Sequence, residues 1–483
     1  MSDVRSSVMG GSYEHAADTS ARIQFRRGLT LTAMTLILPG SAQMAAGNKK
    51  VGRIALRVWL TLIGLGVVAL LVALTSRRGM FSLATNPTLI KLATWALVAA
   101  AAAWVLLLVD AWRLGQPLTM ERNHRLWMTG LNSVLCFVTA GSLLFAAHTV
   151  SAGGHALDTV FASDHVSEAH DGRYNVLLLG GDSGPDRSGV RPDSLTVASI
   201  DADTGRTVLI GLPRNLQNIH FKPGSVMAKQ FPNGFDCDGC YLNAVNTWAN
   251  DHADLFAKEY PGLKNPGIEV TKDTVSEITG LKINYYAMVN MKGFSKLINA
   301  VGGVTVNVQE RTAIGGIGSP IRGYIEAGKQ KLTGDQALWY SRSRVQNDDF
   351  SRMGRQKCVM SAMLHELSPQ KVLTNAQDIA ESSAEMLSTD IPRQDLATFM
   401  DLAIKAKGQK ISSVSLVPPV IYTGNPDFDK VRRMIGKAID KAEGNGGGSS
   451  SAGLVKAKLS VPDVGEGNDP KKANQSDDVA AAC

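Results

Sequence analysis

The most chemically suggestive part of this sequence is a short run rich in arginine. Arg342 and Arg344 are two positions apart, so in an extended segment both side chains would point to one face. Arg352, Arg355 and Gln356 follow at helical spacing, so on a helix they too would share a face. Guanidinium groups crowded in this way repel one another unless anions lie between them, and their planar N–H groups match phosphate oxygens. The run therefore predicts a phosphate-binding site; a solvated charged face, or ion pairs to neighbouring aspartates, is the alternative.

Two further clusters place acidic residues and arginine at the ends of short apolar runs. Asp182 follows Leu-Leu-Leu-Gly-Gly, and Asp193 follows Arg191 at the start of the next apolar run. Carboxylates at the ends of adjacent strands can converge, and hard cations such as Mg²⁺ prefer carboxylate and phosphate oxygens. Arg214 stands in Leu-Pro-Arg-Asn, where a third run ends. The pattern predicts a metal site at Asp182 and Asp193, with turn-capping carboxylates and a solvated or ion-paired arginine as the alternative.

The elements that must position these side chains are short apolar runs separated by helical patterns. Six runs have the length and composition of buried strands: Asn175 to Leu179, Leu195 to Ile200, Thr207 to Leu212, Tyr285 to Val289, Val304 to Val308 and Ser413 to Val417. Four amphipathic patterns predict helices: Leu242 to Trp248, Lys272 to Ile278, Gly293 to Ala300 and Arg352 to Leu367. This alternation predicts an α/β or α+β domain with a mixed central sheet flanked by helices.

The N-terminal third has a different composition and predicts a membrane region over residues 28–150. Residues 1–27 are polar and predict a disordered cytoplasmic tail. Residues 29–46 are apolar but broken by Pro39-Gly40, which favours a re-entrant or interfacial hairpin over a crossing. Three better transmembrane helices follow at about 58–75, 92–109 and 127–147.

Loop charge predicts which side of the membrane the rest of the chain occupies. A cluster of arginine and lysine precedes the first good span, so the positive-inside rule makes that flank cytoplasmic. The loop after the second span is also basic, while Arg77, Arg78 and Lys91 between the first two spans compete. Three spans that start inside place everything after Val150 outside, whereas a fourth crossing by residues 29–46 would place it in the cytoplasm.

The remainder divides into a linker, a domain and a tail. Residues 151–173 predict a polar linker, 174–442 one compact domain, and 443–483, which begin with a Gly- and Ser-rich run, a solvated disordered tail. Cys237 and Cys240 lack the second pair that a zinc ribbon needs. A disulfide, either between these two or with Cys358, is therefore favoured for a domain outside the cell.

Several classes of function are disfavoured by what the sequence lacks. The formal charge of +7 is modest for 483 residues, and the basic residues gather at membrane flanks without a helix-turn-helix pattern. No nucleic-acid partner is therefore expected. The sequence has no nucleophile elbow, Walker loop or dinucleotide fingerprint. The histidines lack ligand spacing and Ser194 has no recognisable histidine partner, so covalent serine catalysis is not expected.

Taken in order, these motifs resemble the LytR-CpsA-Psr (LCP) family over about residues 174–369. The resemblance is carried by Tyr-Asn-Val-Leu-Leu-Leu-Gly-Gly-Asp182, Arg191-Pro-Asp193-Ser, Leu-Pro-Arg214-Asn, Leu-Thr-Gly-Asp-Gln-Ala-Leu-Trp-Tyr-Ser-Arg342-Ser-Arg344 and Asp349-Phe-Ser-Arg352-Met-Gly-Arg355-Gln356. One departure is Asn215, where the family commonly has aspartate. Asparagine accepts a hydrogen bond but adds no charge, so an ion-pair or acid–base role is not expected there.

The resemblance implies a catalytic domain that binds a polyprenyl (pyro)phosphate, with the lipid in an apolar tunnel and the head group held by arginines and Mg²⁺ (or Mn²⁺). By position, Asp182 and Asp193 match metal-associated aspartates, and Asp193 or Asp349 would serve as general base. The lipid-pyrophosphate ligands that it implies are Arg191, Arg214, Arg342, Arg344, Arg352, Arg355 and Gln356. The catalytic residues that it implies are Asp193, Arg214, Arg342, Arg344 and Asp349.

The activity that the resemblance implies is transfer of a polyprenyl-pyrophosphate-linked glycopolymer to peptidoglycan, which forms a phosphodiester and releases polyprenyl phosphate. The protein would be a multi-pass enzyme of the cell membrane with an extracytoplasmic catalytic domain; its partners would be the lipid-linked polymer, the peptidoglycan acceptor and the bilayer. Two alternatives use the same site, namely a non-enzymatic envelope sensor of polyprenyl phosphates and a polyprenyl-pyrophosphate pyrophosphatase. Teichoic acid, arabinogalactan, capsule and glycoprotein glycans all fit as the polymer.

Overall fold

The computed structural model describes residues 22–161, 163, 166–182, 191–316, 318–345, 348–366, 387–444 and 470–483. The predicted disordered tail over residues 1–27 lies almost entirely outside these residues, and from residue 22 onward the chain is helical. The chain divides into two units, one ending at His155 and the other beginning at Ala156. Each unit has its own architecture.

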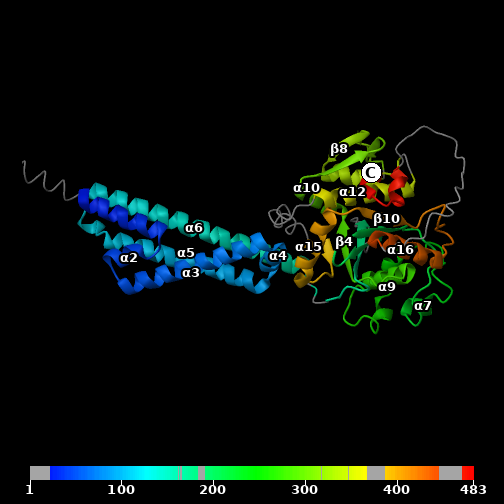
Figure 1. Cartoon of the computed structure of the whole chain (residues 1–483), viewed down its shortest axis with the longest axis horizontal. Coiled ribbons are helices and arrows are strands. Elements are labelled where there is room, and N and C mark those ends of the chain that lie inside the picture. Colours follow the sequence, from blue (N-terminus) through cyan, green and yellow to red (C-terminus); the bar gives the residue numbers. More distant parts are fainter. Residues whose placement is uncertain are drawn as a thin grey trace, which may run out of the picture. The chain divides into compact units, whose positions relative to one another are not determined.

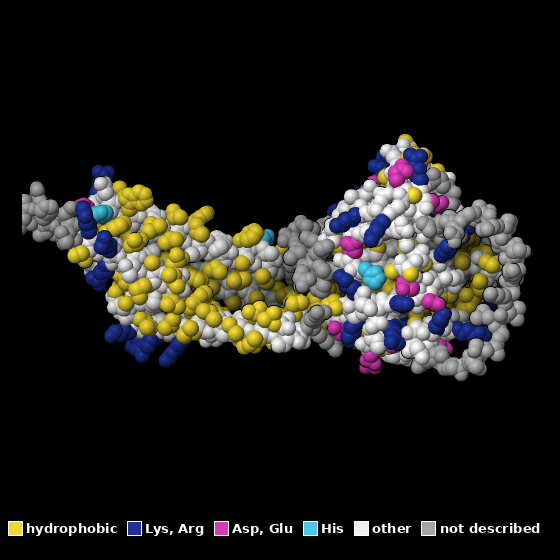
Figure 2. Space-filling view, turned by 45° about the horizontal axis from the view of Figure 1, so that its top comes forward, with side chains coloured by type: hydrophobic (Ala, Val, Ile, Leu, Met, Phe, Trp, Pro, Cys, Tyr) yellow, Lys and Arg dark blue, Asp and Glu magenta, His cyan; other side chains and the backbone are white. Residues whose placement is uncertain are grey.

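The first unit is entirely helical in its described part (Figure 1). Its elements are a helix over residues 22–37, α2 (Ser41–Ala46), α3 (Lys49–Thr75), α4 (Arg77–Thr85), α5 (Pro87–Leu114), η1 (Pro117–Thr119) and α6 (Arg122–Val160). Three helical stretches, Lys49–Thr75, Pro87–Thr119 and Arg122–Val160, are long and apolar enough to cross a membrane, and each contains one of the predicted spans. Figure 2 shows hydrophobic side chains covering much of this unit's visible surface.

The apolar segment before α3 is a helical hairpin with its turn at the predicted break. The first helix ends at residue 37, and Pro39 and Gly40 form the turn before α2. Gly40 has a φ of 94°, and a Cβ at this position would lie 2.6 Å from the carbonyl oxygen of Gly52 on α3. Only glycine tolerates both this backbone conformation and this close approach. The Pro-Gly pair therefore turns the chain back against α3.

A six-stranded mixed sheet forms the centre of the second unit. The strands are β1 (Arg173–Asp182), β2 (Arg191–Asp201), β3 (Thr207–Leu212), β4 (Tyr285–Asn290), β9 (Leu387–Thr389) and β10 (Ile411–Ser415), in the order β10-β3-β2-β1-β4-β9. β1 pairs parallel to β4 and β3 parallel to β10, whereas β1–β2, β2–β3 and β4–β9 are antiparallel. The predicted α/β or α+β class with a mixed sheet is confirmed.

The other elements of this unit are helices and two small two-stranded sheets. The helices are α7 (Val226–Gln230), α8 (Ala244–Asp251), η2 (Ala253–Phe256), α9 (Gly267–Thr279), α10 (Met291–Ala300), α11 (Gly334–Arg342), α12 (Asp349–Glu366), η3 (Arg393–Asp395), α15 (Leu396–Lys407), α16 (Phe428–Glu443), η4 (Pro470–Asn474) and α17 (Val479–Ala482). The small sheets pair β5 (Val304–Val308) with β8 (Gly328–Leu332) and β6 (Thr312–Ile314) with β7 (Gly323–Ile325).

The two faces of the central sheet have different roles. Side chains alternate along a strand, so Leu177 and Val197 point to one face, where they join a fully packed core with α8, α9 and α16. Leu178 and Ala198 point to the other face, which lines a cavity together with α10, α12 and α15. α9 and α12 lie on opposite sides of the sheet (Figure 1). Because both faces are apolar, the strands appear in the sequence as continuous apolar runs.

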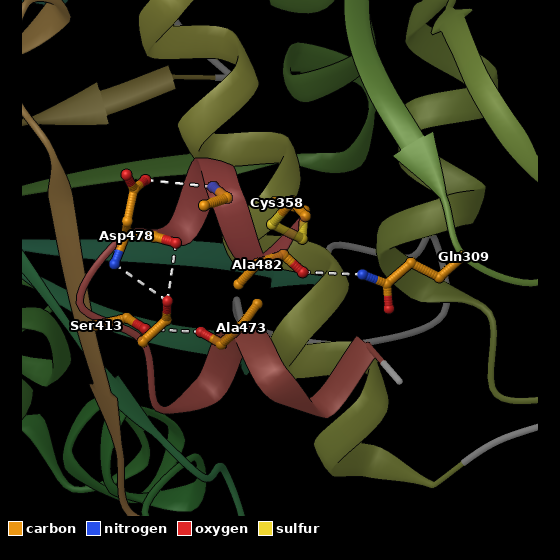
Figure 3. The surroundings of a disulfide bond; sticks show 9 residues. Gln309, Cys358, Ser413, Ala473, Asp478 and Ala482 are labelled. Atoms are coloured by element: carbon orange, nitrogen blue, oxygen red, sulfur yellow. Dashed lines mark hydrogen bonds between the residues drawn. A yellow bond between two sulfur atoms is a disulfide. The ribbon is translucent and has the colours of Figure 1, made fainter. Parts of the chain in front are cut away.

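The last residues of the chain pack on the domain, so the predicted disordered tail over 443–483 is wrong from residue 470 onward. Cys483 forms a disulfide with Cys358 of α12, and Gln309 Nε2 donates to the Ala482 carbonyl at 2.9 Å (Figure 3). Ser413 Oγ of β10 donates to the carbonyl of Ala473 at 2.7 Å. This packed segment, residues 470–483, is called the C-terminal strap below. Residues 445–469 of the predicted tail lie outside the described part.

One further boundary differs from the sequence prediction, and the disulfide pairing resolves the alternatives that the sequence left open. The predicted polar linker over 151–173 begins as helix, because α6 continues to Val160. The predicted local disulfide between Cys237 and Cys240 is confirmed, with a Cα–Cα distance of 5.0 Å. Cys358 bonds to neither of these cysteines, since its partner is Cys483.

Candidate functional site

A large cavity lies between one face of the central sheet and three helices of the second unit. Its volume is about 970 Å³, and apolar side chains form most of its wall, among them Leu178, Ile200, Leu209, Phe294, Met360, Met363, Leu364, Phe399, Leu402, Ala403 and Ala406. Along β2 it runs from Asp193 to Ile200, roughly 20 Å at the usual rise per strand residue. A long, narrow apolar molecule would fill this space.

One end of the cavity is polar, and Asp193 lies there because of an irregularity in the sheet. In the β1–β2 pairing Gly180 is opposite Ser194 and Gly181 is opposite Pro192, so Asp193 is the extra residue on β2. A bulge of this kind re-aims the side chain that it carries. Gly180 permits the close approach, since a Cβ at this position would lie 3.1 Å from the Ser194 Cβ. Asp193 thereby lines the cavity.

Arginines and two carboxylates form an interlocked group at this end. Arg214 Nη1 lies 2.6 Å from Asp193 Oδ1, and Arg352 Nη2 lies 3.0 Å from Asp349 Oδ2. Asp349 Oδ1 is 3.8 Å from both Arg214 Nε and Arg344 Nη1. Arg342 also lines the cavity. The carboxylates of Asp193 and Asp349 neutralise only part of the charge of Arg214, Arg344 and Arg352, so this end attracts anions.

α12 contributes Arg352 and Gln356 from successive turns. Arg352 is only 4% exposed, and burial lowers its pKa while Asp349 opposes that effect. Its Nη2 donates to the Asp193 carbonyl at 3.2 Å, and its Nε has no hydrogen-bond partner among the described residues. Gln356 Oε1 accepts from Ser194 Oγ at 3.0 Å, and its Nε2 donates to the Ser341 carbonyl at 3.2 Å. These bonds hold the first helical turns of α12 against β2 and α11.

Arg355 does not lie at the cavity, which corrects its predicted place among the phosphate ligands. It is 1% exposed, and burial lowers its pKa. Its Nε donates to the Tyr340 carbonyl at 2.8 Å, its Nη2 donates to the Ser343 carbonyl, and its Nη1 lies 3.5 Å from Glu310. The side chain therefore fixes the end of α11 against α12. Helical spacing predicted the shared face correctly for Arg352 and Gln356 only.

Arg342 and Arg344 both line the cavity, but they do not lie in one extended segment as the sequence predicted. Arg342 is the last residue of helix α11, and the chain leaves the helix at Ser343. A Thr333–Gln336 capping box starts this helix, a feature that stabilises helix N-termini. The Arg342 guanidinium lies 5.7 Å from the centre of the Trp339 ring. Both arginines reach the cavity because the helix ends there.

For Asp182 and Arg191, two of the predicted site residues, the structure describes the backbone and not the side chain. Asp182 ends β1, Arg191 begins β2, and the two are opposite one another in the sheet register; their side chains lie outside the described part. The described residues contain no group of three or more Asp, Glu, His or Cys side chains that could hold a metal. Mg²⁺ commonly takes one or two protein carboxylates and completes its shell with substrate phosphates and water. Asp193 fits that pattern as a carboxylate ligand.

Several polar residues at the cavity were not predicted from the sequence as site residues. They are Ser194, Asn215, Tyr241, Asn243, Asn290 and Ser341. Ser194 adjoins the predicted Asp193, and Asn215 adjoins Arg214. Asn243 gave no signal, because the helical pattern that begins at Leu242 placed it inside a helix. It instead stands at the N-cap of α8.

The chain is similar in sequence to a family of known proteins. The sequence pattern of the LytR_cpsA_psr family matches residues 144–428. The chain is similar to the polyisoprenyl-teichoic acid–peptidoglycan teichoic acid transferase TagU of Oceanobacillus iheyensis, at 28% identity over 292 residues, 58% of this chain and 81% of that protein. It is also similar to the corresponding transferase TagV of Bacillus subtilis, at 28% identity over 187 residues, 36% and 48% of the two chains.

Solved structures give a weaker likeness over a similar region. The crystal structure of B. subtilis TagV has 23% sequence identity and a TM-score of 0.39, with 56% of this chain and 98% of that chain covered. The structure described as TagT bound to LIIa-WTA has 19% identity and a TM-score of 0.38, with 58% and 95% covered.

Proposed function

Since the chain belongs to the LytR-CpsA-Psr family over residues 144–428, we propose that it is a membrane-anchored phosphotransferase that attaches a glycopolymer to peptidoglycan. The donor is the glycopolymer linked through a pyrophosphate to a polyprenol. The products are a phosphodiester between polymer and wall, and polyprenyl phosphate. Two of its relatives are named polyisoprenyl-teichoic acid–peptidoglycan teichoic acid transferases, which supports this class of donor and acceptor.

The observation that carries the proposal is the cluster of guanidinium groups at one end of a large apolar cavity. The apolar wall suits a polyprenyl chain, and Arg214, Arg342, Arg344 and Arg352 suit the oxygens of a pyrophosphate. A lipid pyrophosphate has both parts joined covalently. A soluble nucleotide or a neutral lipid would use only one half of the site.

The reaction uses few groups of the protein itself. A hydroxyl oxygen of the acceptor forms a bond to the phosphorus nearest the sugar, and the bond from that phosphorus to the bridging oxygen breaks. The bridging oxygen leaves with polyprenyl phosphate, and the hydroxyl proton passes to Asp193 or Asp349. The arginines stabilise the charge that grows on the equatorial and leaving oxygens, which is the main contribution of a protein to phosphoryl transfer.

A divalent cation fits this chemistry. Asp193 and Asp182 would hold Mg²⁺ against the pyrophosphate, where it would supply further neutralisation of phosphate charge. Loss of transfer on chelation and its return with Mg²⁺ or Mn²⁺ would support this ligand role.

The charge of the helical unit supports an extracytoplasmic catalytic domain. Figure 2 shows lysine and arginine side chains gathered at one end of this unit. Exposed basic residues lie at the start of α3 and the start of α6, among them Lys49, Lys50, Arg53 and Arg122, and Arg113 lies in the last turn of α5. Basic ends of this kind favour the cytoplasmic side. With three crossings that start from that side, the second unit would lie outside the cell, in agreement with the proposed function.

Substitution of two arginines on α12 tests the site, because one faces the cavity and its neighbour does not. Arg352→Met should lower both affinity for a short-chain lipid-pyrophosphate donor and transfer, by about 100-fold or more, since charged hydrogen bonds to the phosphates are lost. Arg355→Met should lower the thermal stability of the full chain and leave the donor KM of the folded protein unchanged. Arg342→Ala should behave like Arg352→Met. Normal transfer and donor binding in both Arg342→Ala and Arg352→Met would refute the site.

A further inference from the structure

Asn243 occupies an N-cap position without acting as a cap. It precedes α8, and no N–H of the described first turn of that helix donates a hydrogen bond to its side chain. Asparagine is among the preferred N-cap residues because its side-chain oxygen accepts a hydrogen bond from the second or third helical N–H. The Asn243 side chain makes no such bond, and the residue lines the cavity, as Arg214 does.

The side-chain oxygen of Asn243 is buried without a partner. The residue is 5% exposed, and its Oδ1 accepts no hydrogen bond from any described residue. A buried acceptor left unpaired is costly, so such a group calls for a donor from outside the protein. The cavity that it lines is where that donor would arrive.

The backbone around Asn243 holds it firmly beside the charged group. Its N–H donates to the Arg214 carbonyl at 3.0 Å, and the N–H of Leu242 donates to the Leu216 carbonyl at 3.0 Å. Leu242 is fully buried, and the disulfide between Cys237 and Cys240 closes the turn just before it. The segment that carries Asn243 is therefore fixed to the segment that carries Arg214, which pairs with Asp193.

The chemistry of an amide oxygen determines which ligand it suits. Pyrophosphate oxygens are acceptors, and at this end of the cavity they find donors in the guanidinium groups. A carbonyl oxygen offers them nothing, but it accepts a hydrogen bond from a hydroxyl group. Among the groups that must meet at this site, the hydroxyl of the acceptor sugar is such a donor.

We propose that Asn243 is an acceptor-binding residue, whose Oδ1 accepts a hydrogen bond from a hydroxyl of the carbohydrate acceptor and so orients that sugar beside Asp193. This inference rests on the proposed transferase function and adds to it a residue specific to the second substrate. Asn243 carries no charge, and the proton of the attacking hydroxyl still passes to a carboxylate.

Steady-state kinetics of the full chain in detergent test the role, because donor and acceptor can be varied separately. The donor is a short-chain polyprenyl-pyrophosphate disaccharide, and the acceptor is a soluble peptidoglycan oligosaccharide. Asn243→Leu should raise the acceptor KM about 5- to 20-fold, as expected for one lost hydrogen bond, and leave the donor KM within about twofold. Asn243→Ser, which restores an oxygen, should recover part of the loss.

Asn246→Leu is the matched control, since Asn246 is an asparagine on the same helix, is 2% exposed and does not line the cavity. It should lower thermal stability and leave both KM values unchanged. Provided that the wild type transfers, a normal acceptor KM in Asn243→Leu would overturn the inference. A raised donor KM in place of a raised acceptor KM would overturn it too. Failure of the wild type to transfer would instead refute the proposed function.

Discussion

At the scale of single residues, burial changes the pKa of a lysine in this domain. Lys357 of α12 is fully buried, and burial lowers its pKa to about 7. Its ammonium donates to Ser415 Oγ of β10 and lies 3.4 Å from the carbonyl oxygen of Asn474. These neutral oxygens solvate the amine but do not neutralise a charge, which explains the direction of the shift.

The lowered pKa predicts how stability depends on pH. The amine has an ordinary pKa of 10.5 when unfolded, so between about pH 7 and 10.5 the unfolded chain binds more protons than the folded chain. The buried lysine therefore destabilises the folded state most at pH 7 and below. The free energy of unfolding rises with pH in this window, by at most roughly 1.4 kcal/mol per pH unit, as the unfolded chain loses its extra proton. Lys357→Met should remove that rise and stabilise the protein at pH 7.

Thermal unfolding of the full chain at pH 7, 8 and 9 measures this effect as the difference between wild type and Lys357→Met. The gap should narrow as pH increases. A gap that stays constant with pH would mean that Lys357 remains charged when buried.

The sequence predicted every charged residue that lines the cavity but missed several neutral polar ones, and the misses have physical causes. Arg214, Arg342, Arg344, Arg352, Gln356 and Asp193 were all singled out and all line the cavity. Arg355 was misplaced because side chains three apart on a helix diverge when one finds carbonyl partners in the adjoining α11. Asn243 was missed because its significance depends on a bond that it does not make, which only the structure reveals.

At the scale of elements, α12 connects the site to the end of the chain. Arg352 and Gln356 of this helix line the cavity, and Cys358 of the same helix forms the disulfide with Cys483 of the C-terminal strap. Asn474 Nδ2 of the strap donates to the Phe350 carbonyl in the first turn of α12 at 2.8 Å. Lys471 Nζ lies 2.9 Å from Asp348, just before that turn. The strap thus braces the part of α12 that holds Arg352.

Removal of the strap disulfide should destabilise the domain and loosen α12. Cys483→Ser opens a covalent loop of 125 residues in sequence separation, and loss of such a crosslink should lower the free energy of unfolding by about 2–4 kcal/mol. The measurement is thermal unfolding of the full chain with and without reductant. Reductant should lower the melting temperature of the wild type much more than that of Cys483→Ser.

A double variant, Cys237→Ser with Cys240→Ser, separates the two disulfides. It should keep the sensitivity to reductant that the strap confers. Equal melting temperatures for wild type and Cys483→Ser would show that the strap contributes nothing to stability.

Elements with a strong apolar period were predictable, and those fixed by tertiary contacts were not. All six predicted strands occur: β3 is buried along its whole length, whereas β5 alternates buried valines with the more exposed Thr305 and Asn307. The sequence predicted no helix over Gly334–Arg342 (α11) and considered an extended segment for Arg342 and Arg344, since polar residues mask the short helical period of α11. The strap follows a Gly- and Ser-rich run and has few apolar residues, so its packing depends on Cys358 and β10, which lie far away in the sequence.

At the scale of the whole molecule, the proposal requires the catalytic domain to lie outside the cell. Lys329 on β8 and Lys50 at the start of α3 are both exposed. In a Cys136→Ala background, which removes the free cysteine among the described residues, Lys329→Cys should react with a membrane-impermeant maleimide in intact cells. Lys50→Cys should react only after lysis. The opposite pattern would place the domain in the cytoplasm, away from peptidoglycan.

The central claim is that arginines at the end of an apolar cavity transfer a phosphate-linked polymer from lipid to wall. Its most direct test follows a radiolabel in the phosphate nearest the sugar of a polyprenyl-pyrophosphate donor, given to the purified full chain with Mg²⁺ and peptidoglycan. The label should appear in a wall phosphodiester, with an equal amount of unlabelled polyprenyl monophosphate. Label released as free sugar phosphate, or donor bound without any product, would contradict the claim.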